Sequence, residues 1–222
     1  DKEFLVNKTK HIKINSAKNR TIIDAEEYIV DRDKFDKHLC NKAIDSGARL
    51  FLNHRYIKNS NKLIEFKDKR ENRLRKVKTD VIIGADGPLS NVAKNNGMFG
   101  NRQFYTGLQA RVRLNNDKEN YEVFLGELFP GFFGWVVPED DNIVRIGVAA
   151  EKNIQVIFDR FLKKRAKRCK IINRQAGLIP IFDPKISSNK GNIYLVGDAA
   201  LQVKATTGGG IIPGMKAAEV LA

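Results

Sequence analysis

The chain has 222 residues, of which 42% are hydrophobic and 30% charged, so its composition is that of a folded protein and excludes intrinsic disorder. Forty lysines and arginines against 26 acidic residues give a net charge of +14, which favours an anionic partner without choosing among nucleic acid, a phospholipid surface and a phosphorylated substrate. Two isolated cysteines exclude a disulfide framework and a zinc site, and no apolar run is long enough to cross a bilayer.

The N-terminal part of the chain predicts strands followed by a helix. Residues 3–30 alternate apolar and polar side chains, as short strands do. Asp31 or Asp33 then caps a helix, and Gly47 occupies the position of a left-handed C-cap. Beyond that glycine, the apolar run 50–52 predicts another short strand.

The rest of the chain changes character twice. Residues 55–79 are highly charged and predict an exposed hairpin, whereas the β-branched run 81–83 is typical of a strand covered on both faces. A helix is expected from about residue 153, and a second buried strand at 193–196. Between these segments, four strands follow one another without helices, at 107–114, 121–127, 132–138 and 143–149. The order is therefore α/β, then antiparallel β, then α/β again.

The most specific motif lies near the end of the chain. The strand at 193–196 leads into 197–200, and the glycines at 208–210 precede a helix with Pro213 in its first turn. Open α/β sheets bind ligands at the C-terminal ends of their strands, and a helix N-terminus offers amide N–H groups. Asp198 and this loop together predict a flavin site, in which the carboxylate accepts a ribityl hydroxyl. A strand–turn–helix connection with a capping aspartate is the alternative.

Two weaker motifs precede it. The segment 84–87, Gly-Ala-Asp-Gly, ends an apolar strand, and Asp-Gly is first of all a turn sequence. The segment 31–36 places Arg32 at a strand-to-helix junction, from which an arginine can reach a phosphate or an adenine edge. Taken alone, that segment favours a solvated helix start.

In this order, the three motifs resemble those of the flavoproteins related to p-hydroxybenzoate hydroxylase. The loop 202–211 and the segment 131–138 resemble the glycine-rich loop and the tyrosine–tryptophan–proline motif of one branch, the geranylgeranyl reductase family, which includes the archaeal digeranylgeranylglycerophospholipid reductases. The likeness covers nearly the whole chain. Phe133 and Val137 stand where this family usually has tyrosine and phenylalanine, so the lining of the lipid tunnel is expected to differ.

The resemblance implies an α/β fold, α+β overall. Residues 1–106 and 188–222 would form part of a three-layer, Rossmann-like FAD-binding domain, and residues 107–187 an inserted antiparallel sheet that binds substrate. The glycine-rich strand–turn–helix that holds the ADP half of FAD is not found in this sequence. We therefore expect the chain to be an internal fragment that by itself binds FAD poorly or aggregates.

The resemblance also assigns residues. Those implied to bind the cofactor are Arg32, Asp86, Gly87, Asp198, Gly209, Gly210 and Ile211. Arg32 would contact FAD from the adenine side, Asp86 would lie near the pyrophosphate, and Asp198 would bind the ribityl chain. The apolar slot for a prenyl chain would be lined by Phe132, Phe133 and Trp135, although each of these is also an ordinary core aromatic. No catalytic residue and no metal ligand is identified.

The implied activity is the saturation of geranylgeranyl double bonds by hydride transfer from reduced FAD, with NAD(P)H or reduced ferredoxin as electron donor. The expected partner is a prenylated lipid or an isoprenoid diphosphate, and the protein is expected in the cytoplasm. The basic run 163–170 favours a solvated helix end, because cations suit a helix C-terminus, and peripheral contact with an anionic membrane is the alternative.

Two other functions remain open at this stage. An aromatic-ring monooxygenase has the same fold, but the glycine-rich loop and the tryptophan motif argue against it. A non-catalytic, basic nucleic-acid-binding module rests on the net charge alone, because no helix-turn-helix, zinc finger or RNA-binding motif supports it. No nucleic-acid partner is therefore expected.

Overall fold

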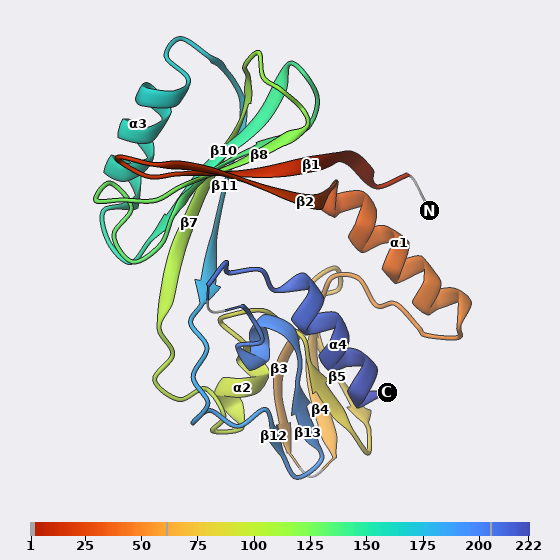
Figure 1. Cartoon of the computed structure of the whole chain (residues 1–222). Helices are drawn as coiled ribbons and strands as arrows, with labels where there is room; N and C mark the ends of the chain where they lie inside the picture. The colour runs from red at the N-terminus through yellow and green to blue at the C-terminus, as the bar shows by residue number, and fades with distance from the viewer. Residues whose placement is uncertain (1–2, 61, 205) are drawn as a thin grey trace. The chain divides into compact units, whose positions relative to one another are not determined.

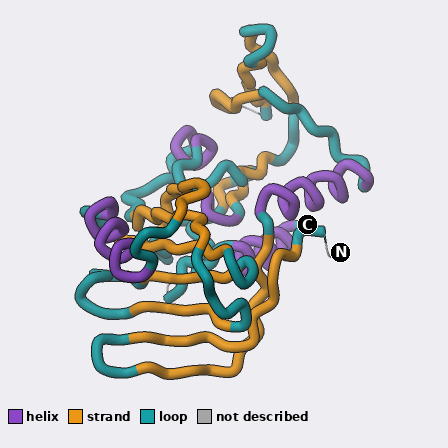
Figure 2. The backbone as a smooth tube through the Cα atoms, turned by 90° about the horizontal axis from the view of Figure 1, so that it is seen from above, coloured by secondary structure: helices purple, strands orange, loops and turns teal. Residues whose placement is uncertain are grey.

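The structure is a computed structural model, and it describes residues 3–60, 62–204 and 206–222. Position 205, within the predicted glycine-rich loop, lies outside the described residues. Strands make up most of the regular structure (Figure 2), and the contacts of the chain divide it into two units. Unit 1 comprises residues 1–49 and 105–177, and unit 2 comprises residues 50–104 and 178–222.

Unit 1 is built around a seven-stranded sheet in the order β11-β7-β10-β9-β8-β1-β2 (Figure 1). Its strands are β1 (Leu5–Asn15), β2 (Arg20–Val30), β7 (Phe104–Arg113), β8 (Asn120–Phe124), β9 (Gly134–Pro138), β10 (Ile143–Ala150) and β11 (Lys170–Pro180). The pairs β7–β10, β10–β9 and β9–β8 are antiparallel, as the run of strands without helices predicts. The hairpin β1–β2 joins this sheet through a parallel pairing of β1 with β8.

One face of this sheet is closed by the helix α3 (Ile154–Arg165). Its Phe158 and Phe161 are 0% and 2% exposed. They pack against side chains that alternate along the strands, among them Ala110, Val112, Val136, Val144, Ile146 and Val148. Because strand side chains alternate between faces, the neighbouring residues Gln109, Arg111, Trp135 and Arg145 project from the opposite face. That second face of the sheet, called the open face below, is where polar and aromatic side chains gather.

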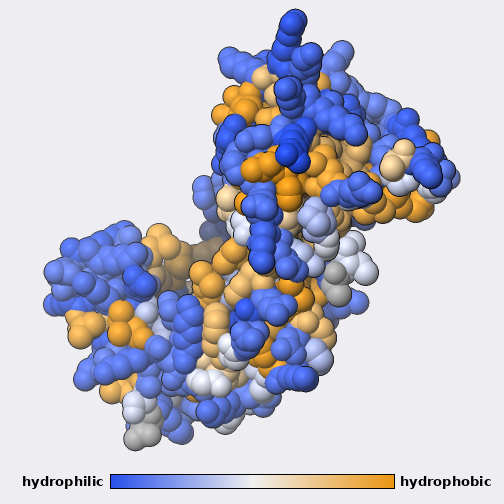
Figure 3. All heavy atoms as spheres, turned by 90° about the vertical axis from the view of Figure 1, so that its left-hand side faces the viewer, coloured by the Kyte–Doolittle hydropathy of each residue, from blue (hydrophilic) through white to orange (hydrophobic). Residues whose placement is uncertain are grey.

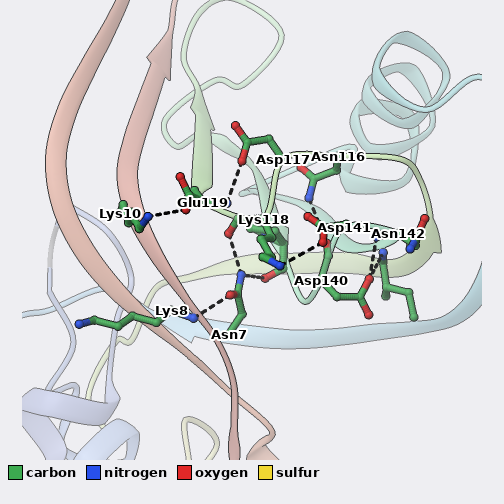
Figure 4. A network of polar contacts seen from close by, with 12 residues as sticks. Asn7, Lys8, Lys10, Asn116, Asp117, Lys118, Glu119, Asp140, Asp141 and Asn142 are labelled. Atoms are coloured by element: carbon green, nitrogen blue, oxygen red, sulfur yellow. Dashed lines mark hydrogen bonds and ion pairs between the residues drawn. The ribbon is translucent and has the colours of Figure 1, made fainter.

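A polar network ties β1 to the loops that connect the central strands (Figure 4). Asn7 Nδ2 donates to the carbonyls of Lys118 and Pro138, at 2.8 and 3.1 Å. Lys118 in turn pairs with Asp141 at 3.1 Å. Asp140 accepts hydrogen bonds from the backbone amides that open β10. These contacts fix the long hairpin β1–β2 to the end of the sheet where the helix α1 begins.

The helix α1 (Arg32–Asp45) follows β2 as the sequence predicts. Asp31 Oδ1 caps it by accepting from the amides of Asp33 and Lys34, at 3.1 and 3.3 Å. Gly47, with φ +97°, supplies the left-handed residue after the helix. None of the helical residues is buried.

Unit 2 holds two small sheets. The first has the order β12-β13-β6, with β12 (Asn189–Lys190), β13 (Ile193–Leu195) and β6 (Ile82–Gly84), and the second is the antiparallel sheet β3 (His54–Ser60), β4 (Leu63–Asp68) and β5 (Arg73–Lys78). Its helical segments are α2 (Asn91–Asn95), the 3₁₀ turn η1 (Gly197–Ala200) and α4 (Ile211–Leu221). The charged segment 55–79 is therefore a three-stranded sheet where a single hairpin was expected.

Two expected strands differ in the structure. The run 50–52 forms no strand: its three side chains are 51–61% exposed, because apolar character alone does not supply a pairing partner. The run 81–83 is covered on one face only, since Ile82 is 6% exposed while Val81 and Ile83 are 50% and 53% exposed. The continuous β-branched run predicted burial on both faces, but β6 is buried on one face only.

The structure confirms the expected fold class, a mixed α/β architecture with an antiparallel sheet. Residues 1–49 lie in the unit of the seven-stranded sheet, and their assignment to an FAD-binding domain stays a prediction. Their pairing through β1 and β8 is a long-range contact that no local pattern encodes. Among the described residues, no helix combines the length and the apolar character needed to cross a membrane.

Candidate functional site

The two aspartate motifs of unit 2 meet at one edge of its small sheet. The strands β6 and β13 are parallel neighbours, with Leu195 opposite Gly84. The amide of Val196 donates to the carbonyl of Gly84 at 3.0 Å. Both strands therefore end together, and the loops that carry Asp86 and Asp198 leave from the same edge. This is the edge at which open α/β sheets bind ligands.

Gly84 allows this close meeting of the two strands. A Cβ at that position would lie 2.8 Å from a methyl carbon of Leu195 and 2.9 Å from Cβ of Val92. Only glycine lets β6, β13 and α2 pack at this distance. The first glycine of the Gly-Ala-Asp-Gly motif is thus a packing requirement of the sheet itself.

The carboxylate of Asp86 organises the loop that follows β6. It accepts from the hydroxyl of Ser90 at 2.5 Å and from the amides of Asn91 and Val92 at 2.7 and 3.1 Å. Gly87, with φ +80°, makes the turn between Asp86 and Ser90. In the structure Asp86 holds the start of α2, and its predicted place beside a pyrophosphate stays a prediction.

A buried arginine that the sequence did not single out supports the same loop. Arg102 is 7% exposed, stacks on Phe99 at 4.6 Å and donates to the carbonyl of Pro88 at 3.3 Å. Burial lowers the pKa of Arg102, and the nearby Asp86 carboxylate opposes that shift. The signal in the sequence is weak, because a lone arginine in a loop is usually solvated.

The second loop has the geometry of a ligand cradle. Gly197, with φ +65°, donates its amide to Oε1 of Gln202 at 2.7 Å. A Cβ on Gly210 would lie 2.8 Å from Oδ1 of Asp198, so that the carboxylate stands directly beside the start of α4. No side chain caps α4 within the described part of the chain, which leaves the amides of its first turn available. Asp198, the glycines at 209 and 210 and the amides at the start of α4 are called the cradle below. A carboxylate beside uncapped amides, with no side chain on the glycines to fill the space, fits a flavin that offers a hydroxyl and a carbonyl.

The remaining predicted cofactor residues are placed as follows. Gly209 and Ile211 flank Gly210 in the cradle, and the turn before them is closed by the amide of Gly208 donating to the carbonyl of Lys204 at 2.9 Å. Arg32 is the first residue of α1 in unit 1, where it pairs with Asp36 at 3.2 Å and is 57% exposed. Within unit 2 the structure brings the predicted residues together, and Arg32 belongs to the other unit.

The predicted substrate residues form a continuous aromatic row in unit 1. Phe132 and Phe133 stack with ring centroids 4.5 Å apart, and Phe133 meets Trp135 edge-on at 5.9 Å. Tyr105, which the sequence did not single out, extends the row by packing on Phe132 at 4.9 Å. Alternation along β9 places Trp135 on the open face of the sheet, and Phe133, which precedes the strand and is 9% exposed, packs against it. The four rings, Tyr105, Phe132, Phe133 and Trp135, are called the aromatic row below.

The indole of Trp135 is held in one orientation. It lies against Gly147 of the neighbouring strand, where a Cβ would approach the ring to 2.3 Å. Its Nε1 donates to Oε1 of Gln109 at 2.9 Å, and Nε2 of Gln109 donates to Oε1 of Gln175 at 2.8 Å. The two glutamines come from β7 and β11, so only the pairing of distant strands reveals them.

No family model matches the chain. Among curated proteins, it is 28% identical over 249 aligned positions to the digeranylgeranylglycerophospholipid reductase of Thermoplasma volcanium, covering 99% of this chain and 63% of that protein. It is 33% identical over 221 positions to the chloroplastic geranylgeranyl diphosphate reductase of Oryza sativa subsp. japonica, covering 88% and 47%. The chain thus spans less than two thirds of the length of these relatives.

Comparison with solved structures agrees with the similarity to geranylgeranyl reductases found among the curated proteins. A geranylgeranyl bacteriochlorophyll reductase-like protein from Thermoplasma acidophilum superposes with a TM-score of 0.87 at 26% identity, over 99% of this chain and 63% of that one. Flavin-dependent halogenases and monooxygenases at 13–16% identity share the fold alone. The chain is therefore a homologue of the geranylgeranyl reductases, and the resemblance seen in its motifs is confirmed.

Proposed function

We propose that the protein carrying this chain is an FAD-dependent reductase that saturates double bonds in the geranylgeranyl chains of lipids. The observation that carries the proposal is the homology to geranylgeranyl reductases over 99% of the chain, in sequence and in structure. The relatives named above act on a geranylgeranyl group attached to a phosphorylated head, in one case a glycerophospholipid and in the other a diphosphate.

The cradle of unit 2 supports the cofactor part of the proposal. The carboxylate of Asp198 can accept a hydrogen bond from a hydroxyl of the ribityl chain. The amides of Gly210 and Ile211 can donate to a ring carbonyl, where the positive end of the α4 dipole favours negative charge. When bound, reduced FAD supplies the hydride for one carbon of the double bond, and a proton completes the other carbon.

The aromatic row of unit 1 supports the substrate part. A prenyl chain is apolar and unbranched apart from its methyl groups, so a row of rings along one sheet face offers it a continuous contact surface. Contact with the rings removes water from the chain and orients it. Gln109 and Gly147 keep Trp135 in the orientation that makes the row continuous.

The test uses the complete gene product, purified and assayed for flavin and for reduction of geranylgeranyl diphosphate. We expect flavin absorption bands in the wild type and their loss in Asp198→Ala and in Gly210→Ala, which fills the cradle. Asp80→Ala is the matched control, because Asp80 is an exposed acid of the same unit whose side chain pairs with Lys62. With reduced FAD, mass spectrometry should show products that have gained two hydrogens for each saturated bond.

Two results would overturn the proposal. One is a folded, complete protein that stays colourless in the presence of added FAD. The other is a flavin-loaded, reduced protein that leaves geranylgeranyl substrates unchanged while it oxygenates an aromatic ring, which would favour the monooxygenase.

The electron donor and membrane contact form the finer part of the proposal. NAD(P)H or reduced ferredoxin would reduce the flavin, and anaerobic bleaching of the flavin bands by one donor and not the other identifies it. Lys163 and Lys164, in the last turn of α3, would contact anionic headgroups. Binding to phosphatidylglycerol vesicles should weaken in a Lys163→Gln/Lys164→Gln variant and at high salt, and unchanged binding would exclude this surface.

A further inference from the structure

A charged cluster lies on the open face of the unit 1 sheet. Nε of Arg111 donates to Oε2 of Glu139 at 2.6 Å, and Nε of Arg145 donates to Oε1 of the same carboxylate at 2.7 Å. The Glu139 side chain is 5% exposed, whereas those of Arg111 and Arg145 are 39% and 23% exposed. Two guanidinium groups around one carboxylate leave the cluster with a net charge of +1.

The cluster is aligned with the aromatic row. The strand register pairs Arg145 with Arg111 on β7 and with Val137 on β9, and two residues along it pairs Gly147 with Gln109 and Trp135. Residues two apart on a strand share a face and lie about 7 Å apart. The cationic cluster is therefore one step along the same face from the indole of Trp135.

The two arginines have N–H donors that their contacts within the cluster do not use. Among the hydrogen bonds of the described residues, Arg111 donates only through Nε, and a guanidinium carries five N–H donors. Arg145 uses one more, from Nη1 to the carbonyl of Val30 at 3.1 Å, which fixes its position. One arginine is enough to neutralise Glu139, so the second contributes uncompensated positive charge to a partly exposed surface.

We propose that Arg111 and Arg145, oriented by Glu139, bind the phosphate headgroup of an anionic prenyl lipid whose chain lies along the aromatic row. The inference rests on the proposed function and adds the recognition of the head to that of the chain. An amphiphile with a charged phosphate end and an apolar tail matches this sheet face. The arginines would bind the phosphate, and the aromatic row, two residues further along the strands, would contact the tail. Guanidinium groups favour phosphate because their N–H donors fit its oxygens in pairs.

The experiment uses binding to the complete gene product, followed by fluorescence. Trp135 is the only tryptophan of the 222 residues, and the part of the emission change that is lost in a Trp135→Phe variant of the complete product reports on the aromatic row. Three probes are titrated: geranylgeranyl diphosphate, geranylgeraniol and inorganic diphosphate. We expect the diphosphate ester to bind the wild type roughly tenfold to a hundredfold more tightly than the alcohol, as loss of a charge-assisted contact implies. Inorganic diphosphate should bind weakly.

Three variants make the test specific. Arg111→Gln should bind the diphosphate ester about tenfold or more weakly and leave the affinity for geranylgeraniol unchanged. Glu139→Gln removes the negative charge and should tighten binding of the ester, the opposite of what a purely structural ion pair predicts. Arg113→Gln, an exposed arginine further along the same strand, is the matched control and should bind all probes as the wild type does.

The outcomes distinguish failure of the headgroup site from failure of the proposed reductase function. If Arg111→Gln and Arg113→Gln bind the ester as tightly as the wild type, or if the wild type binds ester and alcohol equally while reducing both, the headgroup site is overturned and the proposed function stands. If inorganic diphosphate binds as tightly as the ester, the site belongs to free phosphate and the lipid assignment fails. If the flavin-loaded wild type neither binds nor reduces any prenyl compound, the proposed function fails with the inference. Should Glu139→Gln not fold, the pair of arginine variants still decides.

Discussion

The two units differ in how completely their apolar side chains are covered. In unit 1, Phe158 and Phe161 of α3 are almost fully buried against the large sheet. In unit 2, α4 has no buried residue, and its Ile212, Met215 and Val220 are 55%, 48% and 90% exposed. A space-filling view shows apolar patches at the surface among the charged side chains (Figure 3).

The difference between α3 and α4 follows from the surface that each of these two helices covers. Seven strands give α3 a broad apolar face to cover, whereas the sheet β12-β13-β6 has only two or three residues in each strand. Exposed apolar surface of that kind marks places where a protein segment or a ligand makes contact. Each unit therefore has a buried core, that of unit 2 including Ile82, Val92 and Leu195, and α4 in addition leaves apolar surface of unit 2 open to contact.

The largest effect is expected from Phe158→Ala in unit 1. The side chain is fully buried, so its removal leaves a cavity and should lower the free energy of unfolding by about 3–5 kcal/mol. Val156→Ala, on the exposed side of the same helix, should change it by about 0.5 kcal/mol or less. Met215→Ala in α4 should also have a small effect. Denaturant unfolding followed by circular dichroism measures all three, and a large loss in Met215→Ala would break the comparison.

Gly147→Ala should have the next largest effect. The added methyl group would meet the Trp135 indole at 2.3 Å, and such overpacking costs about 1–3 kcal/mol. The emission of Trp135 should also shift as the ring is displaced from Gln109. Gly177→Ala is the matched control on another strand of the same sheet, because nothing lies within 4 Å of the place that its added methyl group would take. Equal behaviour of the two variants would contradict the orientation of Trp135.

A smaller effect is expected from Asp86→Ala in unit 2. The carboxylate accepts from Ser90 and from two amides at the start of α2, and loss of such a cap costs about 0.5–2 kcal/mol. Asn91→Ala removes an exposed side chain of the same helix and should be nearly neutral. The thermal unfolding midpoint of the flavin-free protein distinguishes the two. An unchanged midpoint in Asp86→Ala would mean that the cap contributes nothing.

The smallest expected effect is a pH dependence in the sheet β3-β4-β5. Burial alone raises the pKa of Asp68, but hydrogen bonds from the Glu71 and Arg70 amides and from Arg75 outweigh it and hold the pKa below its ordinary value of 3.8. A carboxylate with a lowered pKa in the folded state contributes stability that is complete above about pH 4 and is lost as the pH falls through the folded pKa. The unfolding midpoint of the wild type should thus approach that of Asp68→Asn in strong acid. A constant difference between them from neutral pH down to strong acid would contradict this.

Local patterns predicted the elements that depend on local physics. The cap at Asp31, the left-handed Gly47, the start of α3 and Pro213 in the first turn of α4 all follow from backbone geometry within a few residues. The residues of the cradle were predicted on the same basis, since a strand end, an aspartate and glycines are neighbours along the chain. Their roles toward a cofactor stay predictions.

Tertiary structure decided what depends on pairing between distant segments. The pairing of strands decides three features that local patterns did not predict. Residues 1–30 join the large sheet, residues 50–52 form no strand, and Ile83 is exposed. The contacts of Gln109 and Gln175 with Trp135, and the cluster of Arg111, Glu139 and Arg145, arise from strand register. Sequence by itself determined the local turns, caps and motifs, because their energies are set by adjacent residues. Only the fold decided which side chains of different strands lie side by side, because that is set by long-range pairing.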